Sequence, residues 1–160
     1  MSKILVLFIV IFVSCNNIID TEKEKNIIIA VIENETSSHF AKDFNQQSKS
    51  FLHDESLIVL VSRKGGYGYA VGWDQISKSI KQNIEKNPNP IAEKFENSDY
   101  KIKVYKKSAW AVYDENVYDS EGEFIRKVIN VRFLEKIDNE WKIVYLSDVN
   151  TTSYEVDTLK

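Results

Sequence analysis

The chain has 160 residues, of which 43% are hydrophobic and 28% are charged, and its net charge is −3. A chain of this length forms one domain that can bury a sufficient core without disulfide bonds. Both signs of charge are interspersed, and this mildly acidic balance lacks the basic face that nucleic-acid binding requires. It gives no electrostatic attraction to anionic lipid either. We therefore expect no nucleic-acid partner.

The first fifteen residues have the layout of a secretory signal. Lys3 supplies a positive start, Ile4 to Val13 is an unbroken apolar run, and Ser14 precedes Cys15, the single cysteine of the chain. These are the n-region, the h-region and the cleavage site of a signal peptide. A cysteine directly after the cleavage site resembles the lipobox of a bacterial lipoprotein. As a helix, the apolar run reaches about 15 Å, which is too short to span a bilayer.

This resemblance implies a lipid anchor on Cys15 and a place in the bacterial cell envelope, with secretion as the alternative. A lipidated Cys15 leaves no thiol for a disulfide, a nucleophile or a zinc ligand. The chain has only two histidines, His39 and His53, and we expect neither a metal nor another cofactor. The chain is then divided into a signal peptide (1–15), a tether (16–25), one folded domain (26–154) and a C-terminal tail (155–160).

The first half of the domain has helical patterns. Thr21-x-x-Glu24 fits a capping box, so a helix is predicted to begin near Glu22. Apolar residues recur at helical spacing over 27–44, which predicts that this helix continues through the segment. A second helical segment is predicted over 44–52.

The middle of the chain combines a strand, a glycine-rich segment and a helix. The aliphatic run over 57–61 predicts a strand. Four of the five glycines fall within 65–72, at a spacing that matches neither a phosphate loop nor a dinucleotide fingerprint. We interpret that segment as a mobile loop. A helix is predicted over 73–86, and Pro88 and Pro90 end it.

From about residue 95 the hydrophobic period changes to two, which is typical of strands. Helices followed by an antiparallel meander of about four strands define the α+β class, with helices covering one face of a curved sheet. The predicted strands lie around 100–104, 109–113, 128–137 and 141–149, with turns at 119–123 and 138–139.

The motifs between Arg132 and Tyr145 resemble those of a known fold. This run contains an arginine-bearing strand, a charged hairpin and a Trp-Lys-Ile-Val strand, and Phe40-x-x-Asp43 matches an earlier position. The pattern resembles the NTF2-like superfamily, a cone-shaped α+β fold that includes the SnoaL-like polyketide cyclases and the association domains of calcium/calmodulin-dependent kinases. The resemblance covers about residues 26–154 and implies N-terminal helices packed on a curved antiparallel sheet.

The resemblance also implies a pocket between the helices and the concave side of the sheet, with Arg132 inside it. Period-two alternation places Arg132 on the same face of its strand as Asn130 and Leu134. A buried, unpaired guanidinium costs several kcal/mol. Arg132 therefore either forms an internal salt bridge or receives an anionic ligand. The carboxylates considered as internal partners are Glu33, Glu35, Asp43 and Asp54.

Aromatic residues make up 12% of the chain, and some are expected to line an apolar pocket of the kind that binds small molecules. Our leading hypothesis is a lipid-anchored domain, not an enzyme, that binds a small anionic or aromatic ligand. The expected ligand-binding residues are Arg132, Trp73, Trp110, Tyr113 and Tyr145.

Two alternatives remain open. The first is a SnoaL-like dehydratase, isomerase or cyclase that uses acid–base chemistry. Many relatives carry two histidines on the last strand, where this chain has Tyr145 and Ser147, so His53 and Asp54 are the remaining candidates for an acid–base pair. The second alternative is an assembly module, since relatives often pair through the convex faces of their sheets. That resemblance implies a homodimer.

Overall fold

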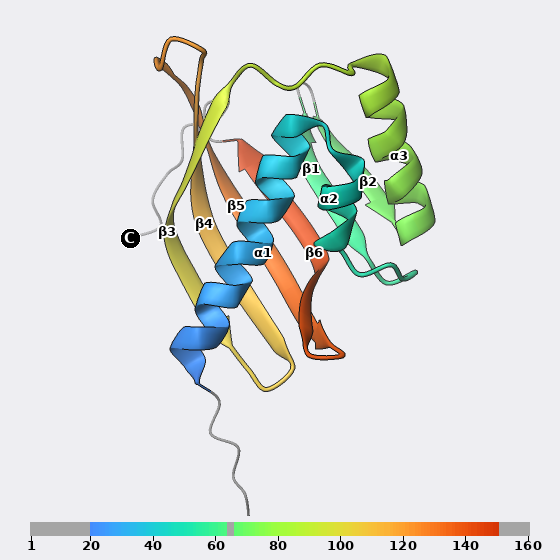
Figure 1. Ribbon diagram of the computed structural model, residues 1–160, viewed down its shortest axis with the longest axis vertical. Coiled ribbons are helices and arrows are strands. Elements are labelled where there is room, and N and C mark those ends of the chain that lie inside the picture. Colours follow the sequence, from blue (N-terminus) through green and yellow to red (C-terminus); the bar gives the residue numbers. More distant parts are fainter. Residues whose placement is uncertain (1–19, 64–65, 151–160) are drawn as a thin grey trace, which may run out of the picture.

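The computed structural model describes residues 20–63 and 66–150, so the signal segment with Cys15 and the tail 155–160 lie outside the described residues. Three helices cover one face of a curved six-stranded sheet in this part of the chain (Figure 1). The elements are α1 (Thr21–Ala41), α2 (Phe44–Lys49), β1 (Ile58–Arg63), β2 (Gly66–Val71), α3 (Trp73–Lys86), β3 (Lys94–Val104), β4 (Ser108–Tyr118), β5 (Phe124–Ile137) and β6 (Glu140–Asn150).

The sheet has the order β2-β1-β6-β5-β4-β3. Strands β3 to β6 form an antiparallel meander, β1 pairs with β2 antiparallel, and β1 pairs with β6 parallel. The predicted α+β class, with N-terminal helices on a curved, mostly antiparallel sheet, is therefore confirmed. The meander also contains the predicted tight hairpin, in which Asp138 and Asn139 both have positive φ, as a type I′ turn requires.

Helix α1 begins where the sequence predicts, but with a different cap. The side chain of Asp20 accepts a hydrogen bond from the backbone N–H of Lys23 at 3.1 Å, so the cap lies one residue earlier than predicted. Glu24 does not complete a capping box. It accepts hydrogen bonds of 2.6 Å from Lys136 Nζ and from Trp141 Nε1. The first turn of α1 is thereby fixed to the β5–β6 hairpin, and part of the expected tether is helical.

The second predicted helical segment is shorter than expected. Helix α1 ends at Ala41 because Lys42 adopts a left-handed conformation with φ of 60°. Asp43 then caps α2 by accepting a hydrogen bond from the backbone N–H of Gln46 at 3.0 Å. Helix α2 ends at Lys49 and does not continue to residue 52, because Phe51 forms a parallel bridge with Ile143 of β6. In this bridge the backbone N–H of Leu52 donates to Ile143 O at 2.9 Å, and that of Ile143 donates to Ser50 O at 2.8 Å.

The glycine-rich segment is a strand, and the prediction of a loop there is wrong. Strand β2 pairs with β1 along its whole length. Tyr67 and Tyr69 are exposed, whereas Gly68 and Ala70 alternate with them toward the interior. The many glycines in this segment favoured the prediction of a loop, so the alternation of exposed and inward-facing residues was not recognised in the sequence. Gly72 follows with φ of +82° at the N-cap of α3, a conformation that favours glycine.

The core lies between α1 and the inner face of the sheet. Ile28 and Ile32 of α1 are fully buried and pack with inner-face residues of β4 to β6. Burial of each such side chain contributes about 1.5–3 kcal/mol relative to exposure. The inner-face residues of this cluster include Ala109, Ala111, Leu134 and Ile143.

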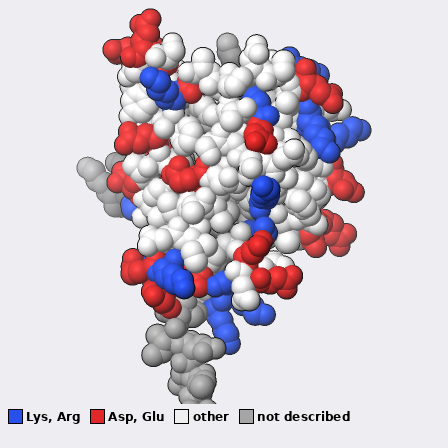
Figure 2. All heavy atoms as spheres, in the orientation of Figure 1, with Lys and Arg blue, Asp and Glu red and all other residues white. Residues whose placement is uncertain are grey.

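The helical face of the molecule carries charges of both signs. Figure 2 shows acidic and basic groups interspersed over this face, with more of them toward its edges than in the middle. In the described residues no helix is both long enough and apolar enough to cross a membrane.

Candidate functional site

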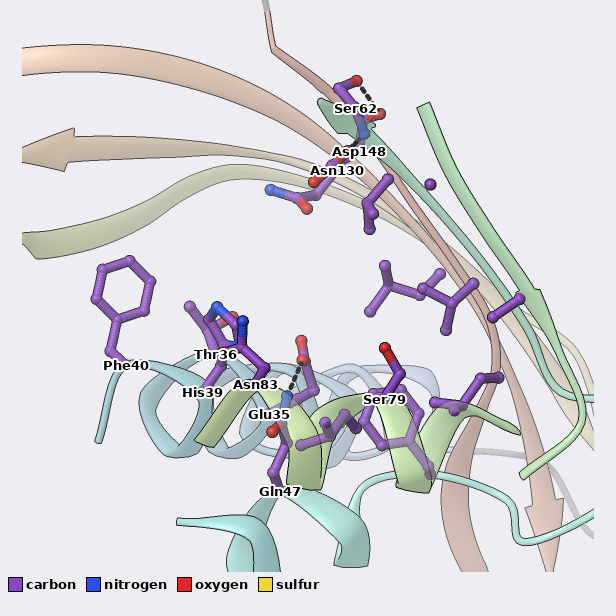
Figure 3. Close-up of a pocket in the computed structure, with 18 of the residues that line it drawn as sticks. Glu35, Thr36, His39, Phe40, Gln47, Ser62, Ser79, Asn83, Asn130 and Asp148 are labelled. Carbon is purple, nitrogen blue, oxygen red and sulfur yellow. Dashed lines mark hydrogen bonds between the residues drawn. The ribbon is translucent and has the colours of Figure 1, made fainter. Parts of the chain in front are cut away.

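A cavity of about 540 Å³ lies between α1, α3 and the inner face of the sheet (Figure 3). Polar residues enter it from both sides, including Thr36 and His39 of α1 and Asn130 of β5. A concave, partly apolar space with a few convergent polar groups is the usual form of a small-molecule site. The apolar part of the lining includes Val59, Val61, Ile76, Ile80, Val128 and Leu146.

Arg132 lines this cavity and forms an internal salt bridge. Its Nη2 lies 3.1 Å from Oε2 of Glu35, and the two side chains are only 4% and 7% exposed. Its Nη1 donates to Oδ1 of Asn130 and to the carbonyl oxygens of Val131 and Ser147. Of the three guanidinium nitrogen atoms of Arg132, only Nε has no hydrogen-bond partner among the described residues. Of the four carboxylates that the sequence offered, Glu35 is therefore the partner.

Two further carboxylates lie on the strands that flank β5, near Asn130. Strand register places Asn130 opposite Asp148 of β6 and opposite Tyr113 of β4, and Glu115 follows two residues later on the same face of β4. Asp148 Oδ1 accepts a hydrogen bond from the backbone N–H of Ser62. The carboxylate of Glu115 makes no hydrogen bond within the described part of the chain. Both carboxylates line the cavity.

The titration of Glu115 is displaced toward neutral pH. Burial raises the pKa of Glu115 to about 7, with Arg132 opposing the rise and Glu35 adding to it. On α1, burial lowers the pKa of His39, which favours the neutral imidazole. A half-buried carboxyl that exchanges protons near pH 7 is typical of functional sites.

The amide of Asn130 supplies a free hydrogen-bond donor. Asn130 is 3% exposed, its Oδ1 accepts from Arg132 at 3.1 Å, and its Nδ2 has no partner among the described residues. In Figure 3 this side chain extends from the sheet into the cavity, across from Thr36 and His39. A buried donor without an acceptor costs about 1–3 kcal/mol. This amide donor and the two carboxylates of Glu115 and Asp148 are therefore available to a ligand.

The four aromatic residues that were predicted to bind a ligand do not line this cavity. Tyr113 is buried and stacks on Tyr100 at 5.0 Å, with the guanidinium of Arg132 at 5.5 Å from its ring. Trp110 and Tyr145 lie on the opposite face of the sheet, with ring centroids 6.4 Å apart. On β4 the alternation places Ala111, and not its neighbour Trp110, on the inner face.

The remaining predicted residues lie together at the start of α3, outside the cavity. His53 stacks on Trp73 with ring centroids 3.9 Å apart, and its Nε2 lies 2.8 Å from the carbonyl oxygen of Ser48. Asp54 accepts a hydrogen bond from the backbone N–H of Ser56 at 2.7 Å, and this bond lowers its pKa. His53 and Asp54 therefore do not form an acid–base pair that faces the cavity.

Neither a family model nor a curated protein sequence matches this chain. Solved structures do match it. A Nostoc punctiforme protein of unknown function with a cystatin-like fold has a TM-score of 0.68 at 14% identity, covering 82% of this chain and 93% of its own. An NTF2-like superfamily protein from Salmonella enterica has a TM-score of 0.68 at 18% identity, with coverage of 88% and 99%.

A proposed dehydratase of the NTF2-like family from Streptomyces avermitilis has a TM-score of 0.65 at 14% identity, covering 82% of this chain and 98% of its own. Helices over a curved antiparallel sheet with a cavity between them define a cone-shaped α+β protein. The matches identify its fold as NTF2-like, which confirms the resemblance found in the sequence. At these identities the likeness establishes the fold and leaves the function open.

Proposed function

We propose that this domain is a binding protein that receives a small molecule in the cavity between α1, α3 and the sheet. The observation that carries the proposal is the Nδ2 donor of Asn130, which is buried, fixed by Arg132 and directed into the cavity without a partner. An oxygen acceptor on the ligand would satisfy this donor. The aliphatic lining supports a ligand whose remaining part is apolar.

In this proposal Arg132 organises the site and does not hold an anion. Its two Nη groups are already engaged by Glu35 and Asn130 and by backbone carbonyls. Glu115 and Asp148 would repel an anion from the same cavity. We therefore retain a small-molecule ligand near Arg132, but not the anionic ligand that the sequence suggested. The signal-like first fifteen residues support a lipid anchor on Cys15 and a role in the cell envelope.

A thermal-shift screen of residues 16–160 against a metabolite library tests the binding proposal. A ligand at 100 times its Kd adds about 2.7 kcal/mol of stability, which raises Tm by several degrees. Ser79 lines the cavity from α3, so Ser79→Phe should fill the space and abolish the shift. Lys78→Phe, at the exposed neighbouring position, should retain it. A library without hits, or hits that Ser79→Phe leaves unchanged, would contradict the proposal.

An acid–base enzyme is the second candidate function, because Glu115 lies in the same cavity with a pKa of about 7. The Streptomyces avermitilis protein of the same fold is described as a proposed dehydratase. Mass spectrometry of each hit after incubation separates the two candidates. A binding protein returns its ligand unchanged, whereas an enzyme yields a product that disappears with Glu115→Gln.

We also propose a homodimer that forms through the outer face of the sheet. Trp110, Phe133 and Tyr145 cluster there, with the rings of Trp110 and Phe133 4.8 Å apart and Trp110 45% exposed. Exposed apolar patches of this kind mark interaction surfaces.

Light scattering at micromolar concentration should give the mass of two chains for the wild type and of one chain for Trp110→Glu. Tyr105→Glu, at an exposed aromatic residue directly after β3, should leave the dimer intact. A wild-type mass of one chain would exclude this assembly.

A further inference from the structure

We propose that the ligand's polar end carries a protonated amine beside an oxygen atom, with the ammonium held by Glu115 and Asp148 and the oxygen by Asn130. This inference rests on the proposed binding function and names the chemical class of the ligand. Amino alcohols with an apolar body belong to that class.

The strand register brings the three groups to one place. Asn130 of β5 pairs directly with Asp148 of β6, and Glu115 of β4 pairs with Val128, which is the next residue on the same face of β5. All of these residues line the cavity. Neighbouring strands are about 4.8 Å apart, and diagonal neighbours such as Glu115 and Asn130 about 7–8 Å, which a long side chain can span. A small molecule with nitrogen and oxygen on adjacent carbons can therefore enter between these side chains and contact the carboxylates and the amide.

The pairing of charges in the cavity favours a cation beside Glu115 and Asp148. Both guanidinium groups of the described lining pair with other carboxylates, Arg132 with Glu35 and Arg126 with Glu93 at 2.8 Å. Lys42 of the lining donates to the amide oxygen of Asn83 at 3.0 Å. Glu115 and Asp148 are left without a salt-bridge partner among the described residues. A cation that neutralises them in a partly desolvated space interacts more strongly than it would at an exposed surface.

The buried amide distinguishes this site from a simple cluster of acids. Carboxylates alone would accept any cation, including a hydrated metal ion. The Nδ2 of Asn130 is a donor, and only an acceptor satisfies it. The aliphatic wall formed by residues such as Val59, Val61 and Leu146 has no polar group for a hydrated ion. The combination fits an organic amine with an oxygen acceptor and an apolar body.

Binding of such a cation should be linked to the release of a proton. The ammonium favours the charged form of Glu115, which is partly protonated near pH 7. Affinity should therefore rise between pH 6 and pH 8, while the amine itself remains protonated. The titratable or charged groups that influence Glu115 from the surrounding elements are Glu35, Arg126, Arg132 and Asp148, and His39 also lines the cavity.

Three probes of matched shape test the proposal on the full chain at pH 8, by calorimetry and by NMR of the Asn130 amide. They are phenylalaninol, 2-methyl-3-phenylpropan-1-ol, which replaces the ammonium with a methyl group, and 2-methyl-3-phenylpropanoate. We expect phenylalaninol to bind at least tenfold more tightly than the alcohol, and the carboxylate to bind most weakly. Glu115→Gln should remove most of the preference for the amine, and Glu123→Gln, an exposed carboxylate outside the cavity, should preserve it.

The outcomes separate this inference from the proposed function. If the alcohol or the carboxylate binds as tightly as the amine and shifts the Asn130 amide, the cavity binds small molecules but the amine class is wrong. If no probe perturbs that amide, the amine class is also wrong, and the metabolite screen with Ser79→Phe decides separately whether the cavity binds another ligand. An amine preference that survives Glu115→Gln together with Asp148→Asn would overturn the assigned contacts.

Discussion

Replacing Arg132 with methionine is expected to lower the free energy of unfolding by about 3–5 kcal/mol. The substitution leaves Glu35 buried, with 7% of its side chain exposed and without its cation. It also removes the donor that fixes Oδ1 of Asn130. Urea denaturation at pH 7 measures the effect, which should move the midpoint and leave the slope unchanged.

Two further variants determine whether loss of the Arg132–Glu35 ion pair causes the loss of stability. Lys142→Met breaks a salt bridge with Glu140, whose side chain is 70% exposed, and should cost less than about 1 kcal/mol. The double variant Arg132→Met with Glu35→Leu removes both buried charges and should recover most of the loss, because an apolar replacement of a buried pair is often neutral. If the single variant is as mild as Lys142→Met, the pair does not stabilise the domain.

The parts of the fold that could be predicted are those with a local signal. The alternation along β5 correctly placed Arg132 on the buried face with Asn130 and Leu134. The Asp138–Asn139 turn and its two flanking strands follow from residues within one hairpin. A period of two, bounded by turn residues, contains enough information for such elements.

The contacts of the site could not be predicted because they join distant segments. Glu35 and Arg132 are 97 residues apart, so the sequence offered four equivalent partners and no means of choosing between them. Glu115 was missed because the predicted strand ended at Tyr113, whereas β4 continues to Tyr118 and carries Glu115 on the same face as Tyr113. Trp110 was expected to line the pocket as one of the chain's many aromatic residues, yet its position in the alternation places it on the outer face of the sheet.

Replacing Glu115 with glutamine is expected to stabilise the empty domain at pH 8 but not at pH 4. Burial raises the pKa of Glu115 from 4.5 to about 7 in the folded state. The folded chain then binds the proton more tightly than the unfolded chain, so the stability from the protonated carboxyl is present below about pH 4.5. That stability is lost as the pH rises through 7. Glutamine is neutral at every pH and avoids the loss.

The difference between the two pKa values sets an upper limit of about 3 kcal/mol for the gain at pH 8. Because Glu115 is partly accessible within the cavity, we expect about 1–2 kcal/mol. Urea denaturation measures this gain in stability. The midpoints are compared for the wild type, Glu115→Gln and the exposed control Glu123→Gln at pH 4 and pH 8. Equal stability of the wild type and Glu115→Gln at pH 8 would mean that the carboxylate is well solvated and that its pKa is ordinary.

A gain in stability on removing Glu115 would connect the energetics of the domain with its proposed role. A carboxylate that lowers the stability of its own fold at neutral pH is typical of functional sites, where local strain is retained for binding or catalysis. An ammonium group beside Glu115 would relieve the same unfavourable charge, so the amine should stabilise the wild type more at pH 8 than at pH 6. Glu115→Gln should show a higher Tm without ligand and a smaller increase with phenylalaninol. The single substitution would then raise the stability of the empty domain and weaken its binding of the amine. A Glu115 with a purely structural role would not produce this combination.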